Sequence, residues 1–166
     1  MKIVIIGSGN VAYHFAKAFS QKNIPVSQVF GRNELALKEI SEEFKIPFST
    51  SEIAQADLYL LSVNDDSVET ISAKILNENA LVAHTSGSLP KEILQGNYRK
   101  ASFYPLQTFS KSKELQYEEI PFFVEAENAE DLEVLRNLAS QISKNVTISD
   151  YEKRKYIHIT AVFAFN

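Results

Sequence analysis

Residues 1–19 read MKIVIIGSGNVAYHFAKAF, and this stretch decides the class of fold. Residues 2–6 form a short, largely β-branched run that ends at Gly7, which is typical of a buried parallel strand followed by a turn. From residue 10 onward, apolar residues recur with the spacing of one helix face, at Val11, Phe15, Ala18 and Phe19. We expect this helix to end near residues 22–23 and to cover a parallel sheet.

The turn between this strand and helix carries the pattern G-x-G-x-x-A over residues 7–12. Gly7 permits a tight turn, Gly9 has no Cβ to keep the backbone away from a pyrophosphate, and Ala12 lets the helix lie close to the sheet. The helix N-terminus offers free N–H groups and positive potential to phosphates. The pattern therefore predicts a dinucleotide site, the alternative being a glycine turn in some other α/β fold.

Strand and helix patterns alternate along the rest of the chain. We expect further strands at residues 26–30, 46–48, 58–63, 80–83, 101–104, 121–125 and 146–148. Further helices are expected around residues 37–44, 68–76 and 129–144, and from residue 150 onward. This order predicts an α/β fold of Rossmann type, a doubly wound, mostly parallel sheet with helices on both faces.

Composition excludes several classes of function. The chain has 166 residues and a formal net charge of −4, which argues against nucleic acid as a partner. It has no cysteine, and His14, His84 and His158 lack metal-ligand spacing, so we expect no metal site. No apolar run approaches the roughly 18 residues of a membrane span, and residues 1–7 are too short for a signal peptide. We therefore expect a cytoplasmic protein with no membrane partner.

The end of the second expected strand carries the residues that choose between dinucleotides. An NAD site normally has Asp or Glu at this position, which accepts hydrogen bonds from the ribose hydroxyls. This chain has Gly31, Arg32 and Asn33 there, and no carboxylate before Glu34. Arg32 suits the 2′-phosphate of NADP, the alternative being a solvated surface arginine. We therefore expect NADP as the cofactor.

Several motifs together resemble a known family: GSGNVA at 7–12, FGRN at 30–33, SVNDD at 62–66, HTSGS at 84–88 and SFYPLQTFS at 102–110. The combination resembles the NADP oxidoreductases that have a Rossmann-like N-terminal domain and a helical C-terminal domain. That family is similar to pyrroline-5-carboxylate reductase, ketopantoate reductase and the 6-phosphogluconate dehydrogenase group. The resemblance covers the whole chain, and HTSGS followed by FYPLQTFS is its most specific part.

The resemblance implies roles for residues that follow successive strands. The pyrophosphate would lie on Gly7, Ser8, Gly9, Asn10 and Val11. The adenosine phosphate would meet Gly31, Arg32 and Asn33, and the ribose would meet Val63, Asn64 and Asp65. Thr85, Ser86 and Gly87 would face the nicotinamide.

The resemblance also implies a division of the chain at residue 150. Residues 1–149 would be the NADP-binding domain, and residues 150–166 would begin a helix that leads into a helical domain absent from this sequence. Homodimers would form through that C-terminal helical region. The alternative is a terminal helix that packs back on its own domain and so covers its apolar residues, which include Phe163 and Phe165.

Hydride transfer also needs a proton donor, and the candidates have structural alternatives. His84 and Ser86 are the catalytic candidates, although His84 could instead bond a backbone carbonyl and Ser86 could instead form a turn. Weaker candidates are Tyr104, Gln107, His158 and Asn166. Tyr104 is more typical of a core aromatic and His158 of a helix histidine with its bonds satisfied. His14 is expected at the surface or at the boundary of the core, with no catalytic role.

The function expected from these residues is NADP-dependent reduction of a small carbonyl or imine substrate. The alternative is a sensor or scaffold that binds NADP without turnover, because a Rossmann domain alone does not imply catalysis. A third hypothesis is an α/β interaction module that binds no nucleotide.

Overall fold

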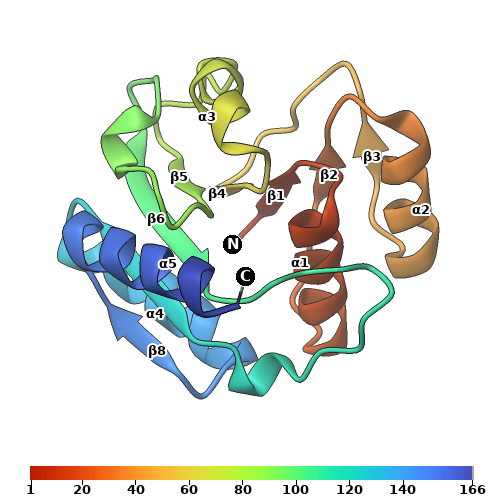
Figure 1. The fold of residues 1–166 in the computed structure, drawn as a ribbon. Helices are drawn as coiled ribbons and strands as arrows, with labels where there is room; N and C mark the ends of the chain where they lie inside the picture. Colours follow the sequence, from red (N-terminus) through yellow and green to blue (C-terminus); the bar gives the residue numbers. More distant parts are fainter. Residues whose placement is uncertain (166) are drawn as a thin grey trace.

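The sheet matches the expected class. The computed structural model describes residues 1–165 and contains these strands: β1 Ile3–Ile6, β2 Gln28–Phe30, β3 Phe48–Ser49, β4 Leu58–Leu61, β5 Leu81–His84, β6 Arg99–Pro105, β7 Phe122–Ala126 and β8 Val146–Ile148. Within the described residues they form one eight-stranded sheet in the order β3-β2-β1-β4-β5-β6-β7-β8. All neighbouring strands are parallel except β6 and β7. The predicted doubly wound, mostly parallel sheet is confirmed (Figure 1).

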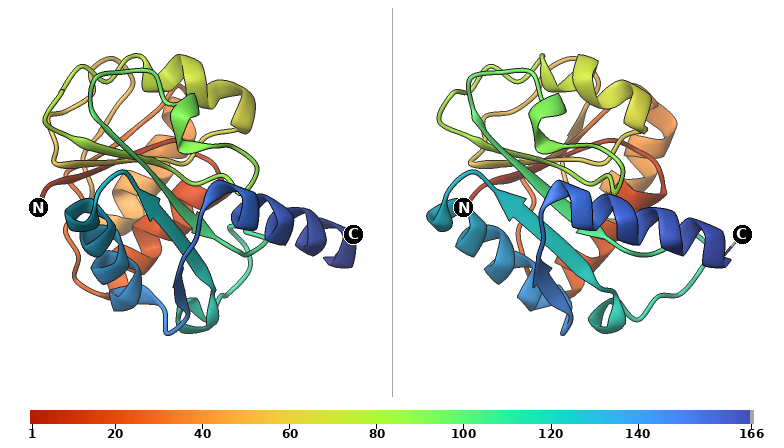
Figure 2. Two further views of the ribbon diagram at one scale, coloured as in Figure 1. Left: turned by 90° about the vertical axis from the view of Figure 1, so that its left-hand side faces the viewer. Right: turned by 60° about the vertical axis from the view of Figure 1, so that its left-hand side comes forward.

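Helices cover both faces of this sheet (Figures 1 and 2). The α-helices are α1 Asn10–Gln21, α2 Glu34–Phe44, α3 Asp65–Ser72, α4 Ala129–Ile142 and α5 Tyr151–Phe165, and short 3-10 turns lie at Lys91–Ile93 and Tyr117–Glu119. Buried residues of α1, α2 and α4 share one core cluster, whereas α3 and the Lys91–Ile93 turn belong to a second cluster on the other face.

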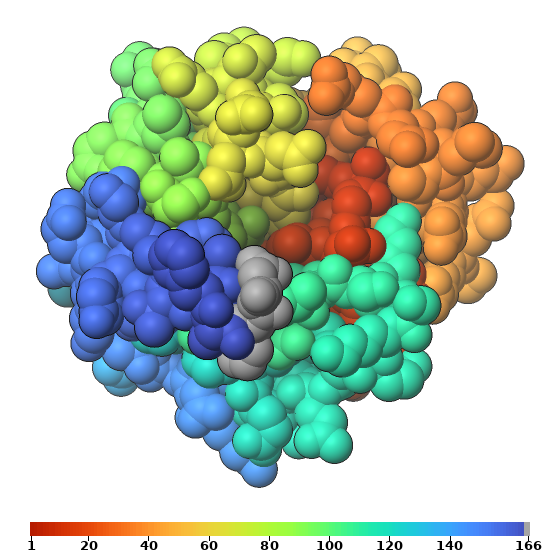
Figure 3. All heavy atoms as spheres, viewed as in Figure 1, coloured from red at the N-terminus to blue at the C-terminus, as the bar shows by residue number. Residues whose placement is uncertain are grey.

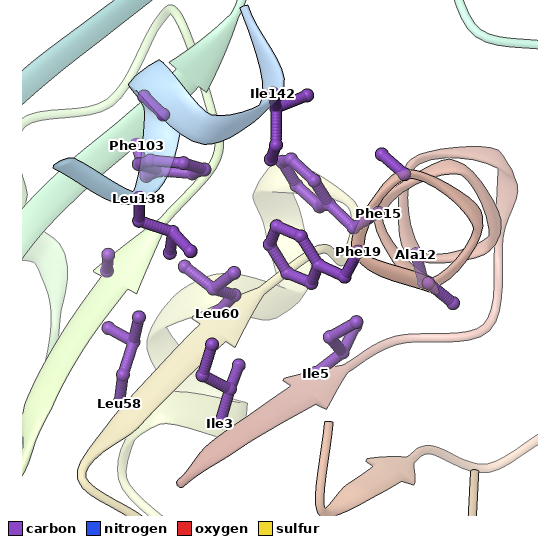
Figure 4. Packing of buried hydrophobic residues seen from close by; sticks show 14 of the residues in the cluster. Ile3, Ile5, Ala12, Phe15, Phe19, Leu58, Leu60, Phe103, Leu138 and Ile142 are labelled. Atoms are coloured by element: carbon purple, nitrogen blue, oxygen red, sulfur yellow. The ribbon is translucent and has the colours of Figure 1, made fainter. Parts of the chain in front are cut away.

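Every residue of β1 and β4 is buried because both sides of these strands are covered. Ile3 and Ile5 of β1 belong to the α1 side, and Val4 and Ile6 belong to the α3 side. In Figure 4 the rings of Phe15 and Phe19 extend from α1 into this core, Phe19 toward Leu60 and Phe15 toward Ile142. Each such fully buried side chain contributes about 2 kcal/mol by its removal from water.

Side chains of β6 and β7 alternate in the same way. Phe103 and Val124 lie in the cluster with α4, so Tyr104 and Glu125 point to the opposite side. That opposite side is where α5 packs, since Arg154 pairs with Glu125 at 3.4 Å. Arg154 is fully buried and also donates to the carbonyl of Leu89 at 2.6 Å. This arginine therefore ties the first turns of α5 to the loop after β5.

Some expected bounds were wrong. The helix after β4 was expected around residues 68–76 but ends at Ser72, and Leu76 is 84% exposed. Apolar spacing alone could not show that the helix stops and the chain turns away there. The third strand lies at residues 48–49 rather than 46–48, while β8 has the expected bounds.

His14 is a further correction. It was expected at the surface or at the boundary of the core, yet it is only 1% exposed. Its Nδ1 lies 2.6 Å from the hydroxyl of Tyr117, and its Nε2 lies 2.6 Å from the carbonyl oxygen of Ser110. The segment that follows β6 crosses α1 and covers this side of the helix, a long-range contact that the helical pattern does not encode.

The last helix exposes a row of large apolar side chains. Tyr156, Ile159, Val162 and Phe163 are exposed, and the C-terminal end of α5 extends away from the sheet (Figure 2). The side chain of Phe165 lies outside the described part of the chain. The domain boundary at residue 150 and the dimer contact through this region stay predictions. In residues 1–165, no helix combines the length and apolar character that a membrane crossing requires.

Candidate functional site

The carboxyl ends of β1, β2, β4 and β5 lie level at one edge of the sheet. Ile6 pairs with Phe30 and with Leu61, and Leu61 pairs with His84. The chain leaves β1 toward β2 on one side, while β4 lies on the other, which is the topological switch point where open α/β sheets bind ligands. Figure 3 shows the segment that follows β1, in red, at the bottom of a hollow between α3, α2 and the segment after β6.

Gly7 fits the turn for two physical reasons. Its φ of 132° lies in a region that side chains with a Cβ rarely adopt. A Cβ at this position would also clash with the carbonyl oxygen of Ser62. The N–H of Gly7 donates to Phe30 at 2.7 Å, so the loop is held between the ends of β2 and β4.

Gly9 faces open space instead. A Cβ added to Gly9 would meet no atom within 4 Å. Gly9 is the N-cap of α1, no side chain bonds the free N–H groups there, and the first turn holds no acidic residue. Four backbone N–H groups at a helix start lack partners within the helix, so this end of α1 can donate to an anion. The arrangement fits a pyrophosphate.

A cavity of about 540 Å³, here called the glycine-loop cavity, opens beside this turn. It is lined by Ile6, Gly7, Ser8, Gly9, Phe30, Gly31, Arg32, Asn33, Thr50, Ser62, Val63, Asn64, Ser67, Ile71 and Lys74. Two cations, Arg32 and Lys74, stand in this lining, and the described lining holds no carboxylate. Sequence reasoning missed Lys74, because it lies beyond α3 and nothing near it in the chain marks a site.

Asn33 has a structural role besides the expected one. Its side-chain oxygen accepts from the backbone N–H of Ala36 at 3.1 Å and so caps α2. Only the NH₂ of this amide is then free for a phosphate. The sequence placed Asn33 at the correct strand end without revealing that half of its hydrogen-bonding capacity serves the helix.

A second cavity, the strand-end cavity of about 370 Å³, brings together residues that are distant in sequence. It is lined by Val11, Val63, Asn64, Asp65, Thr85, Ser86, Gly87, Tyr104 and His158. Six of these residues were expected to meet the ribose or the nicotinamide, and Val11 was expected at the pyrophosphate. Asp65 is held by the hydroxyl of Ser88 at 2.5 Å, which fixes the loop after β5 against the start of α3.

His84 lies beneath this cavity rather than in its wall. It is fully buried, its Nε2 donates to the carbonyl of Pro90 at 3.2 Å, and its Nδ1 accepts from the N–H of Ser86 at 3.1 Å. Burial, and secondarily the charge of Arg154, lowers the pKa of His84 to about 4. These contacts match the alternative of a histidine bonded to a backbone carbonyl. A catalytic role for His84 stays a prediction that this geometry does not favour.

Ser86 also matches its structural alternative, because its hydroxyl accepts from the N–H of Ser88 at 3.1 Å, as in a turn. Its side chain still borders the strand-end cavity.

Tyr104 and His158 form a pair, although the sequence made each of them only a weaker catalytic candidate. The hydroxyl of Tyr104 lies 2.8 Å from Nδ1 of His158, and the rings meet edge to face. Burial raises the pKa of Tyr104 to about 12.

Gln107 donates to the carbonyl of Thr108, and the predicted role of Asn166 falls outside the described residues. Among residues 1–165, no three histidine or acidic side chains come together as a metal site would require.

Two family models match the chain. The model described as NADP oxidoreductase, coenzyme F420-dependent, matches residues 2–87, which hold the glycine loop, Arg32 and the loop after β5. A domain of unknown function (DUF2520) matches residues 120–166. Among curated proteins, none matches this chain.

Solved structures share the fold. A candidate NADP oxidoreductase from Bacteroides fragilis is 38% identical with a TM-score of 0.94, and the match covers 99% of this chain and 66% of that one. A prephenate dehydrogenase from A. aeolicus, solved with hydroxyphenyl propionate and NAD⁺, is 18% identical with a TM-score of 0.76, covering 95% of this chain and 62% of that one. A pyrroline-5-carboxylate reductase from Coxiella burnetii is 15% identical with a TM-score of 0.78, covering 98% and 66%. The chain thus spans just under two thirds of the length of these proteins.

Proposed function

Since this chain belongs to the family described as NADP oxidoreductase, coenzyme F420-dependent, we propose that it is an NADP-dependent reductase of a small carbonyl or imine compound. The observation that carries the proposal is the glycine-loop cavity, where a phosphate-binding turn and two cations surround a space lined by no carboxylate among the described residues. A nicotinamide dinucleotide agrees with the family and with the fold. The choice of NADP rests on the residues of this chain.

Arg32 and Lys74 support NADP over NAD. Both residues line the cavity that lies beside the end of β2, where the adenosine ribose lies in Rossmann folds. A 2′-phosphate there would gain charge-assisted hydrogen bonds from a guanidinium. An NAD site would instead use a carboxylate to hold the 2′-hydroxyl, and the described lining offers none.

Different residues of the chain bind and orient different parts of the dinucleotide. The first turn of α1 holds the pyrophosphate, and Asp65 at the start of α3 suits ribose hydroxyls because a carboxylate accepts their hydrogen bonds. Bound NADPH would supply a hydride to the substrate carbon. The hydroxyl of Thr85 donates to the carbonyl of Leu61 at 3.0 Å, which holds this side chain against the end of β4.

Two measurements on the full gene product test the proposal. Calorimetric titration with NADP⁺ and NAD⁺ should give at least about tenfold tighter binding of NADP⁺, which corresponds to about 1.4 kcal/mol. NADPH oxidation should then appear with at least one member of a panel of aldehydes, 2-oxo acids, cyclic imines and oxidised coenzyme F420. Equal affinity for the two cofactors would contradict the NADP assignment. Tight NADP⁺ binding without oxidation by any acceptor would favour the sensor alternative.

A further inference from the structure

We propose that Tyr104 and His158 are the catalytic pair of this site, and that the cavity on their far side holds a small carbonyl substrate with an anionic group. The inference rests on the proposed reductase function and adds to it the proton donor, the position of the substrate and the class of substrate.

Tyr104 and His158 stand between two cavities. They line the strand-end cavity, on the side where the nicotinamide is expected, together with Thr85 and Gly87. They also line a separate cavity of about 500 Å³, here called the α5 cavity. It is lined by Tyr104, Leu106, Gln107, Thr108, Lys113, Pro121, His158, Ala161 and Val162. A substrate in the α5 cavity would therefore meet a nicotinamide in the strand-end cavity at this pair.

Gly87 shows that the pair is closely fitted to the loop after β5. A Cβ at Gly87 would lie 2.6 Å from Cζ of Tyr104 and 2.7 Å from Cγ of His158. The absence of a side chain there lets both rings approach the loop. The three residues come from the loop after β5, from the end of β6 and from α5, so the pair exists only because α5 packs across the sheet.

The hydroxyl of Tyr104 is suited to give a proton to a reduced carbonyl. The tyrosine is only 7% exposed, and the high pKa that burial produces keeps it protonated at neutral pH. The alkoxide formed when a carbonyl accepts a hydride is much more basic than a phenolate, so the transfer runs downhill. A protonated imine would need no such proton, and the pair therefore points to a carbonyl substrate.

The step balances as follows. The carbonyl carbon accepts the hydride and its two electrons from the nicotinamide cofactor, which becomes oxidised, and the C=O double bond becomes a C–O single bond. The substrate oxygen takes the proton of the Tyr104 hydroxyl, whose O–H bond breaks as the new one forms. The phenolate regains a proton from Nδ1 of His158 at 2.8 Å, and Nε2 of His158 takes one from a water molecule, whose hydroxide passes to the solvent.

The lining of the α5 cavity indicates the charge of the substrate. Among the lining residues that the structure describes, Lys113 is the only lysine, arginine or carboxylate. In residues 1–165, Lys113 takes part in no ion pair, whereas nearby Lys111 pairs with Glu39. A carboxylate or phosphate on the substrate would pair with Lys113 while the carbonyl faces Tyr104.

The first test measures binding and does not depend on catalytic turnover. Histidine Cε1–H resonances of the full gene product are followed by NMR while NADP⁺ is added. The signal of His158 should move because the positively charged ring would lie beside it. Phenylpyruvate is then added to the NADP⁺ complex, and the amides of Gln107 and Thr108 should shift. A His158 signal that does not respond to bound NADP⁺, or amides that do not respond to phenylpyruvate, would overturn the proposal.

The second test compares two tyrosine variants on a carbonyl compound that the wild type reduces. Tyr104→Phe should lower kcat about 100-fold, which is within the usual effect of losing a general acid, and should leave NADP⁺ affinity within threefold. Tyr98→Phe is the matched control, since Tyr98 is also buried but donates to Ser72 away from the site, and its kcat should not change.

A Tyr104→Phe enzyme with the kcat of the wild type would overturn the proton-donor role while leaving the reductase function intact. A wild type that binds no NADP⁺, or that reduces no acceptor of the panel, would instead contradict the proposed function, and the proposal would fall with it.

Discussion

Around the glycine-loop cavity, the residues that would contact phosphate lie, apart from Lys74, at the ends of β1 and β2 and in the few positions that follow each strand. Around Tyr104 and His158, the partners are 54 residues apart in the chain and meet only after α5 has packed across β6 and β7. The first region can be written as a short motif because a tight turn and a helix start are local structures. The second cannot, because its geometry depends on where a distant helix lies. This difference explains why the sequence predicts the cofactor region better than the catalytic one.

The two glycines of the turn allow the sharpest test of the local region. Gly7→Val should lower the free energy of unfolding by at least about 3 kcal/mol, because the side chain would clash with Ser62 and φ would be strained. Gly9→Val should leave the fold intact, since a Cβ there meets nothing within 4 Å, and should abolish NADP⁺ binding. Urea unfolding and calorimetry measure the two effects. Unchanged cofactor affinity in Gly9→Val would show that the turn holds no phosphate.

Arg32 tests whether one local residue sets the cofactor. Arg32→Asp should weaken NADP⁺ binding about 100-fold, or about 2.7 kcal/mol, since one charged contact is lost and one repulsion is added. NAD⁺ should then bind more tightly than NADP⁺. Lys74→Gln is the matched variant from outside the motif and should weaken NADP⁺ binding by a smaller factor. If Arg32→Asp keeps the preference of the wild type, the guanidinium is only a solvated surface group.

The dependence of stability on pH tests whether His84 is buried in its neutral form. Its pKa is about 4 in the folded chain and about 6.5 when unfolded, so the unfolded state binds the proton more tightly. The stability due to neutral His84 is therefore present above pH 6.5 and is lost as the pH falls toward 4. Between pH 7.5 and pH 5 the loss should be about 2 kcal/mol.

The measurement for His84 is urea unfolding at both pH values for the wild type and for His84→Gln. The variant should lose about 2 kcal/mol less than the wild type over this interval, because glutamine does not titrate. Equal losses in the two proteins would show that His84 is not buried in its neutral form.

Substitution of Asn33 should give the smallest effect, and it distinguishes the capping of α2 from the binding of NADP⁺. Asn33→Ala should cost about 1 kcal/mol of stability through loss of the α2 cap, whereas Asn33→Ser should keep most of it. Thermal unfolding measures this difference. If serine restores stability but not NADP⁺ affinity, then the free amide NH₂ of Asn33 also contacts the cofactor.

The predicted elements and the observed ones differ where contacts between distant segments decide the outcome. The apolar strands β1 and β4 were visible because a strand buried on both faces has a continuous apolar run. The early end of α3 was not visible, because Ile75 is buried by a turn rather than by the helix that its spacing suggested. His14 was misplaced because Ser110 lies 96 residues away in the chain and Tyr117 lies 103 residues away.

The sequence by itself determined the Rossmann fold, the glycine turn and the strand ends at which Arg32, Asn64 and Thr85 stand. These features depend on alternating apolar patterns and on turns that involve neighbouring residues. Only the tertiary structure decided that His84 is buried against backbone groups, that Lys74 joins Arg32 in one cavity, and that Tyr104 meets His158. Burial and side-chain pairing depend on which distant segment packs across the sheet, and the residue pattern along the chain does not identify that segment.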